Sequence, residues 1–326
     1  MASGSNVAMT SPGTNMTQVV AGDVVDDADF NNMRTNIQLM LGNANDAQLS
    51  AGGSFNYNNA YGWGQGGAGV NTNSAGNSIL ASGSSRGFKD LQDDVQAMCA
   101  FLGESVRSGV GSDVTSSTTI TASTWSNCML NIKDCWDDRY TPASRTVATD
   151  ASKTFTSSWT NTLTQETTWT FANEGACRAF FNGGGRLGYS ASYTGSSGAQ
   201  FEAHRDRLSG MGDFYMTYNT SGASAGSASG IGFYELATSY QTLWTYYGAS
   251  SPYSNDYVQT SAKVNSVTNP TVVTLRIQLV DASDNVIDAS ATGTLTINAR
   301  RHQPDASGSG FSFAVPTDSM GNITGS

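Results

Sequence analysis

The chain has 326 residues, of which 13% are charged, and its formal net charge is −10 at pH 7. A protein that binds DNA or RNA needs clustered Lys and Arg to neutralise phosphates, and the 16 basic residues here are scattered, so nucleic-acid binding is not expected. With 38% apolar residues and few charges, the surface must consist mainly of neutral polar side chains, which is typical of fibrous, shell-like or secreted assemblies.

The N-terminus shows neither the basic segment nor the apolar run of a secretory signal, and no window holds about 18 consecutive apolar residues. We therefore expect synthesis in the cytoplasm of the producing cell and no contact with a membrane. Residues 1–22 are rich in Ser, Gly, Asn and Thr, and this composition predicts a flexible N-terminal arm.

A helix is predicted over residues 22–42, where Asp26 or Asp27 caps the start and Gly42 follows the last turn. Residues 43–84 have neither helical nor strand periodicity and predict a long loop, whose aromatic residues include Tyr57, Tyr61 and Trp63.

Two further helices are predicted, over residues 87–103 and 121–140, and Ser123 or Thr124 caps the second. Helices of this length are marginal without packing, and the loops between them do not favour efficient packing within one chain. We therefore predict that residues 23–149 form an oligomerisation or attachment region whose apolar stripes contact a partner. The predicted interface residues are Phe30, Ile37, Phe88, Trp125 and Ile132.

From residue 150 onward the pattern changes to the two-residue alternation of strands, interrupted by Gly, Ser, Asn and Asp turns. About seven short strands are predicted, with one short helix over residues 198–210 and a hairpin turn at Asp284-Asn285. The predicted fold class is α+β: a short helical N-terminal part is followed by a mainly antiparallel β-sandwich domain at residues 150–326.

The segment CRAFFNGGGRLGYSAS, from Cys177 to Ser192, contains three consecutive glycines. A phosphate-binding loop would need a strand before the glycines and a helix N-terminus after them, and here Arg186 and Leu187 continue a strand pattern. We predict instead a kink or bulge in a central strand, which Phe180 and Phe181 anchor and at which another backbone approaches closely.

The histidines and cysteines do not indicate a catalytic or metal site. His204 and His302 are the only histidines, no G-x-S-x-G or H-E-x-x-H motif occurs, and both histidines are predicted at the surface. The cysteines lack metal-ligand spacing and are predicted to be buried and reduced; they are Cys99, Cys128, Cys135 and Cys177. No catalytic, cofactor-binding or metal-binding residue is assigned, and the chain is predicted not to be an enzyme.

Acidic residues gather before the first helix and around a later turn. Helix capping and turn formation explain both groups better than Ca²⁺ binding, because neither follows the spacing of a calcium loop. The residues are Asp23, Asp26, Asp27 and Asp29, and Asp281, Asp284 and Asp288.

Tyrosine and tryptophan are concentrated in the segments FYELATSYQTLWTYYG and SPYSNDY. Exposed Tyr and Trp side chains recognise sugars or proteins, whereas buried ones form core. The sequence leaves both interpretations open.

Short motifs occur along the chain in a fixed order. The pattern [RK]-x-F-F-N-x-G-G-x-[IL] is matched by Arg178, Phe180, Phe181, Asn182, Gly184, Gly185 and Leu187. Ala28 to Ile37, Leu41-Gly42 and Tyr61 to Gln65 precede it, and Met211-Gly212, Phe214, Asp284, Asp288 and Gly293 to Thr296 follow it. In this order the motifs resemble a family of virion structural proteins from tailed bacteriophages, frequent among myoviruses of cyanobacteria and other marine or soil bacteria.

The resemblance implies a non-enzymatic subunit of the tail, baseplate, collar or a fibre, located in the virion. It implies that the chain contacts copies of itself and other virion structural proteins. A trimer is weakly favoured over a six-fold ring. The alternative is a carbohydrate-binding adhesin, in which Tyr and Trp side chains on the same sandwich recognise a receptor.

Overall fold

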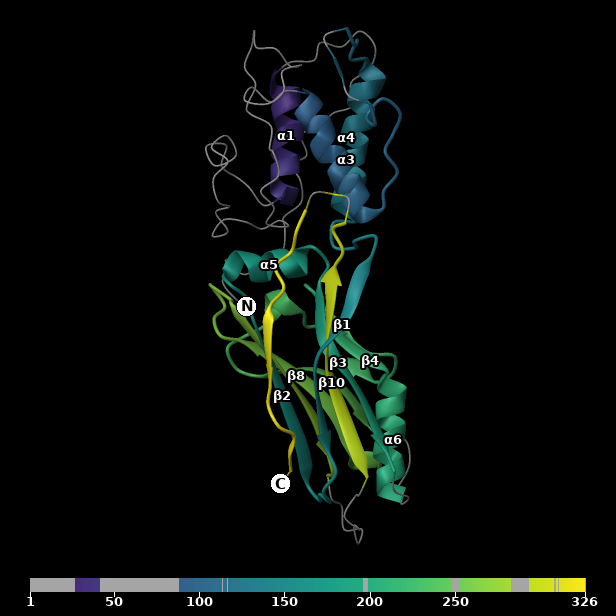
Figure 1. Ribbon diagram of the computed structural model, residues 1–326, viewed down its shortest axis with the longest axis vertical. Helices are drawn as coiled ribbons and strands as arrows, with labels where there is room; N and C mark the ends of the chain where they lie inside the picture. Colours follow the sequence, from purple (N-terminus) through teal and green to yellow (C-terminus); the bar gives the residue numbers. More distant parts are fainter. Residues whose placement is uncertain are drawn as a thin grey trace.

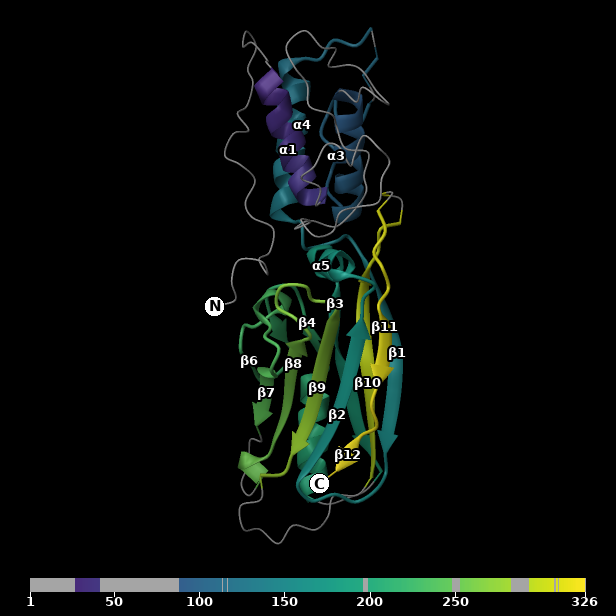
Figure 2. The ribbon, with the colours of Figure 1, turned by 90° about the vertical axis from the view of Figure 1, so that its left-hand side faces the viewer.

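The computed structural model describes residues 27–41, 88–112, 114–115, 117–195, 199–247, 253–282, 293–307, 309 and 311–325. A helical bundle and a β-sandwich lie end to end in an elongated molecule (Figures 1 and 2). The α+β prediction, with helices before a mainly antiparallel sandwich, is confirmed. The predicted arm at 1–22, the loop at 43–84 and the turn at Asp284-Asn285 lie outside the described residues.

The bundle consists of α1 (Asp27–Leu41), α3 (Phe88–Leu102) and α4 (Ala122–Asp137). Thr121 caps α4, because its side chain accepts a hydrogen bond from the Thr124 backbone N–H; the predicted caps Ser123 and Thr124 are both inside the helix. Stacking of Phe88 on Trp125, with ring centroids 5.4 Å apart, joins α3 to α4.

The prediction that the apolar stripes of the helices contact a partner is wrong for this chain. The five predicted interface residues lie in one cluster inside the bundle, and none is more than 2% exposed; they are Phe30, Ile37, Phe88, Trp125 and Ile132. The stripes cover one another, so any interface must use other residues.

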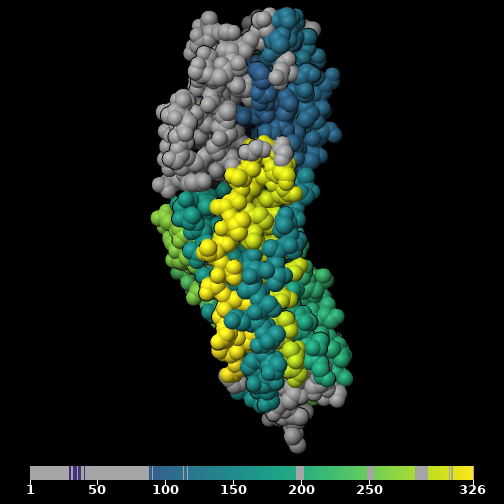
Figure 3. Space-filling view, viewed as in Figure 1, coloured from purple at the N-terminus to yellow at the C-terminus, as the bar shows by residue number. Residues whose placement is uncertain are grey.

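The C-terminal segment supplies part of that cover. Phe311 and Phe313 pack against Phe101 of α3, with ring centroids 5.6 and 5.3 Å away. Figure 3 shows this segment, in yellow, running from the bundle down one face of the sandwich. The two parts are therefore joined by contacts between residues far apart in the sequence.

The sandwich has two antiparallel sheets among the described residues. One has the order β1 (Arg145–Phe155), β10 (Thr294–Pro304), β3 (Arg186–Thr194), β4 (Asp213–Met216) and β5 (Ser221–Gly222). The other has the order β11 (Thr317–Met320), β2 (Thr162–Thr170), β9 (Val272–Val280), β8 (Tyr257–Val264), β7 (Gln241–Tyr247) and β6 (Ser227–Ala228), and β12 (Thr324–Gly325) also pairs with β2. The first strand begins at Arg145, slightly before the predicted domain boundary at residue 150.

Alternating side chains of both sheets form the sandwich core, as in Val273, Leu275 and Ile277 of β9, each fully buried. The Tyr189 hydroxyl donates to the Leu275 carbonyl oxygen at 2.7 Å and so links the two sheets. The predicted helix at 198–210 is α6 (Ala199–Met211), which lies along one side of the sandwich (Figure 1). Short 3₁₀ helices occur at Phe233–Glu235 and Tyr253–Asn255.

The FFNGGG segment is not a kinked strand. Its first three residues end α5 (Glu174–Asn182), Gly183–Gly185 form a turn, and β3 follows from Arg186; α5 lies between the bundle and the rest of the sandwich (Figure 2). The Asn173 side chain caps α5 by accepting from the Ala176 N–H at 2.9 Å. Glu174 and Arg178 pair one helical turn apart at 2.6 Å, so local signals favour helix over strand.

Candidate functional site

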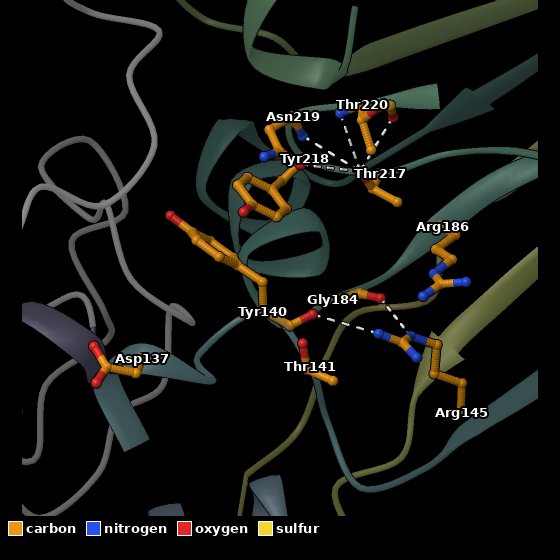
Figure 4. Close-up of a pocket in the computed structure, with 10 residues that line it drawn as sticks. All are labelled: Asp137, Tyr140, Thr141, Arg145, Gly184, Arg186, Thr217, Tyr218, Asn219 and Thr220. Carbon is orange, nitrogen blue, oxygen red and sulfur yellow. Dashed lines mark hydrogen bonds between the residues drawn. The ribbon is translucent and has the colours of Figure 1, made fainter. Parts of the chain in front are cut away.

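A cleft of about 210 Å³ lies where the bundle meets the sandwich. The linker after α4, the glycine turn, the first residues of β1 and β3 and the turn after β4 surround it (Figure 4). The lining residues are Asp137, Tyr140, Thr141, Arg145, Gly184, Arg186, Thr217, Tyr218, Asn219 and Thr220. A second cleft of about 360 Å³ is lined by Phe155, Ser158, Trp159, Thr160 and Gly325, which include no charged side chain.

Arg145, the first residue of β1, is half-buried and holds two loops together. Its Nε donates to the Gly184 carbonyl oxygen at 2.7 Å, and its Nη2 donates to the Tyr140 carbonyl oxygen at 3.3 Å. Burial and the neighbouring Arg186 lower the pKa of Arg145 to about 10, so it still carries its charge at neutral pH.

Arg186, the first residue of β3, faces the same cleft (Figure 4). Its guanidinium carbon lies 4.6 Å from the centre of the Tyr215 ring. Its Nε is buried and has no hydrogen-bond partner among the described residues. Its β10 neighbour His302 is half-buried rather than at the surface, and burial, with Arg186, lowers the pKa of His302.

Two tyrosines form the opposite wall of the cleft. The rings of Tyr140 and Tyr218 stack with centroids 3.5 Å apart and an angle of 16° between their planes. The turn that carries Tyr218 is fixed by Thr217, whose hydroxyl donates to the Thr220 carbonyl oxygen at 3.1 Å. The wall therefore combines aromatic surface with hydroxyl and amide groups.

The glycine turn is tightly enclosed. Gly184 has a φ of +82°, and a Cβ there would lie within 3.0 Å of the Tyr140 carbonyl oxygen and of Pro142. A Cβ on Gly185 would meet Phe180 equally closely. The prediction of close backbone approach therefore holds at Gly184, although the approaching segment is the linker after α4 rather than a strand.

The other motif residues pack directly beneath this turn. The Phe181 ring stacks on Phe233, with centroids 4.2 Å apart and planes within 9°. The Asn182 Oδ1 accepts from the Tyr234 hydroxyl at 2.8 Å. The structure thus brings together all five predicted motif residues as a buried joint: Phe180, Phe181, Asn182, Gly184 and Gly185.

Of the eight aromatic side chains in the two Tyr- and Trp-rich segments, three are buried, four are half-buried and one is exposed. Phe233 and Trp244 are at most 1% exposed, and Tyr234 is buried as well. Tyr247 is 57% exposed and lies beside Tyr257, with ring centroids 5.2 Å apart. Core packing therefore accounts for three of these side chains, whereas the other five, all tyrosines, reach the surface at least in part.

The prediction that His204 lies at the surface is wrong. Its side chain is fully buried on α6, with its ring centroid 5.0 Å from that of Trp159. Burial, followed by the charge of Arg207, lowers the pKa of His204 to about 3. The polar sequence of α6 conceals this buried position, because its neighbours Arg205 and Asp206 are exposed.

All four cysteines are free and buried. Cys135 has Cys99 as its neighbour, with Sγ atoms 3.6 Å apart. No group of three or more His, Cys, Asp or Glu side chains in the described part of the chain is placed to hold a metal ion. Of the predicted acidic groups, Asp23, Asp26, Asp284 and Asp288 lie outside the described residues, whereas Asp281 is buried at the end of β9.

Sequence reasoning did not identify the cleft residues Arg145, Arg186, Tyr140 and Tyr218. They come from separate segments, and the only local signal is the position of Arg186 directly after the glycines. No protein-family model, curated protein or solved structure matches this chain. Across the described helices, none has the combination of length and apolar character required to cross a membrane.

Proposed function

We propose that this chain is a non-enzymatic structural subunit of a tailed-phage virion, in the tail, baseplate, collar or a fibre. The observation that supports this most directly is the buried joint. Five of the residues that carry the resemblance are all used in packing at the junction of bundle and sandwich: Phe180, Phe181, Asn182, Gly184 and Gly185. A motif used in this way has an architectural role.

Shape and composition add to this proposal. The molecule is elongated, with a helical part at one end and a sandwich at the other (Figure 1). Its surface carries few charges for its length, which suits repeated contacts between identical subunits. Because the helical stripes are already buried, assembly through copies of itself and other virion proteins would use residues on the outer surface.

Mass spectrometry of gradient-purified virions from the source lysate tests this proposal. The chain should be present in a fixed number of copies per particle, and analytical ultracentrifugation of the purified protein should show a trimer. If the chain is absent from particles that are complete and infectious, the proposal is wrong. If ultracentrifugation shows a six-fold ring, the proposed virion role stands and the trimer is wrong.

A second candidate, a carbohydrate-binding adhesin, is favoured by one observation. The cleft combines stacked tyrosines, hydroxyl and amide groups and two arginines, which are the groups that bind sugars. This location differs from the strand aromatics that suggested the adhesin from sequence. Binding of the isolated chain to a glycan array, reduced by changes in the cleft, would support it.

A further inference from the structure

Two arginines in the cleft lie side by side without a carboxylate between them. Arg145 and Arg186 point toward one another in Figure 4, and the charge of Arg186 contributes to the lowered pKa of Arg145. Among the described residues that line the cleft, Asp137 is the one acidic side chain, and it is paired with Lys133 at 2.6 Å. In a chain with a net charge of −10, this is a local excess of positive charge.

The two guanidinium groups have unused donors. Arg145 donates through Nε and Nη2 to carbonyl oxygens, and its Nη1 has no partner among the described residues. Arg186 donates no hydrogen bond to any described residue, and its contact is with the face of Tyr215. Donors that are not used within the chain can form charge-assisted hydrogen bonds, so an anion that accepts from both guanidinium groups would be stabilised.

The other residues that line the cleft indicate which further chemical groups a ligand would have. Tyr218, which stacks on Tyr140, offers aromatic surface, and Thr217, Asn219 and Thr220 offer polar groups along one turn. The volume of about 210 Å³ is smaller than the roughly 300–1,000 Å³ of sites for drug-sized ligands. The occupant is therefore a small, hydroxyl-rich unit with one negative group.

We propose that this cleft binds a carboxylated sugar, such as a uronic acid unit of an acidic polysaccharide. The planar forks of Arg145 and Arg186 match the two oxygens of a carboxylate. Tyr218 and the polar turn contact the ring and hydroxyl groups of the sugar. This inference deepens the adhesin candidate and does not depend on the virion role, because binding is measured on the isolated chain.

Isothermal titration of the full chain with sodium D-glucuronate, D-glucose and N-acetyl-L-aspartate tests the proposal. Glucuronate should bind at least about tenfold more tightly than glucose, which lacks the carboxylate, and more tightly than N-acetyl-aspartate, which lacks the sugar ring. Equal or tighter binding of N-acetyl-aspartate would overturn the proposal, because it would indicate that the cleft binds an acidic peptide rather than a sugar. Absence of glucuronate binding at millimolar concentration would also overturn it.

Two variants test the residues. Arg186→Gln should weaken glucuronate binding by about tenfold or more, and Arg186→Lys, which keeps the charge without the fork, should weaken it less. Arg205→Gln is the matched control, because Arg205 is exposed on α6, away from the cleft, and pairs with the adjacent Asp206. If Arg186→Gln melts like the wild type and binds glucuronate unchanged, the assignment of the cleft is wrong.

Discussion

Replacing Gly184 with alanine tests whether the joint between bundle and sandwich is as tightly built as the structure indicates. The residue has a φ of +82°, which costs an L-residue roughly 1–2 kcal/mol. The new Cβ would also overlap the Tyr140 carbonyl oxygen and Pro142, and overpacking of this kind costs about 1–3 kcal/mol. We expect a total loss of roughly 2–5 kcal/mol in the free energy of unfolding.

Two other glycines separate these contributions. Gly230 has a φ of +78°, and no atom lies within 4 Å of the position that a Cβ would take, so Gly230→Ala should lose only the roughly 1–2 kcal/mol of backbone strain. Gly222 also has open space and no positive φ, so Gly222→Ala should change stability by less than about 0.5 kcal/mol. Denaturant titration followed by tryptophan fluorescence measures all three. If Gly184→Ala costs no more than Gly230→Ala, the linker can move away and the joint is not rigid.

Three further experiments test the burial of residues in the cores. Trp125→Ala should destabilise the purified chain by about 3–5 kcal/mol without any partner present, whereas Val147→Ala at a 47% exposed position should not; equal melting temperatures would contradict the bundle core. Burial holds the pKa of His204 near 3, whereas the ordinary value is 6.5. As pH falls below 6.5, the unfolded chain therefore binds a proton that the folded chain does not. The free energy of unfolding should be about 2 kcal/mol lower at pH 5 than above pH 6.5. His204→Gln should remove that part of the difference in urea midpoint between pH 7 and pH 5, and an unchanged difference would place His204 in water. The native chain should resist iodoacetamide and take up four labels after unfolding; a Cys99–Cys135 disulfide in the native chain would refute this, since their Sγ atoms are 3.6 Å apart and a bond needs about 2.05 Å.

The fold class follows from sequence because periodicity is strong where burial is one-sided. Alternation in β9 and β10 and the stripes of α1, α3 and α4 each match their buried faces. However, the local sequence of a helix does not indicate which segment packs against its apolar stripe. Phe311 and Phe313 cover Phe101 from a position more than 200 residues later in the chain, a contact that the sequence of the helix does not indicate.

The sequence of segment 173–185 suggests a strand with a bulge, because adjacent aromatics run into glycines. The stronger signals are an Asn cap, the Glu174–Arg178 pair and the spacing of Cys177, Phe180 and Phe181, all of which fit a helix that ends at glycine. The cleft could not be predicted at all, since Tyr140, Arg145, Arg186 and Tyr218 meet only after the sandwich has closed.

Arg186 occupies the unspecified position of the motif, between Gly185 and Leu187. The specified residues build the joint, whereas this one faces the cleft and donates no hydrogen bond to the described chain. Arg186→Glu should therefore fold normally, because the new carboxylate relieves the repulsion that now acts on Arg145. The same carboxylate would occupy the free donors of Arg145 and repel an anion. We expect an unchanged or higher melting temperature together with loss of glucuronate binding, measured by calorimetry on one preparation. A variant that loses stability and binding together would show instead that Arg186 belongs to the joint, and that the cleft is only a seam between the two parts.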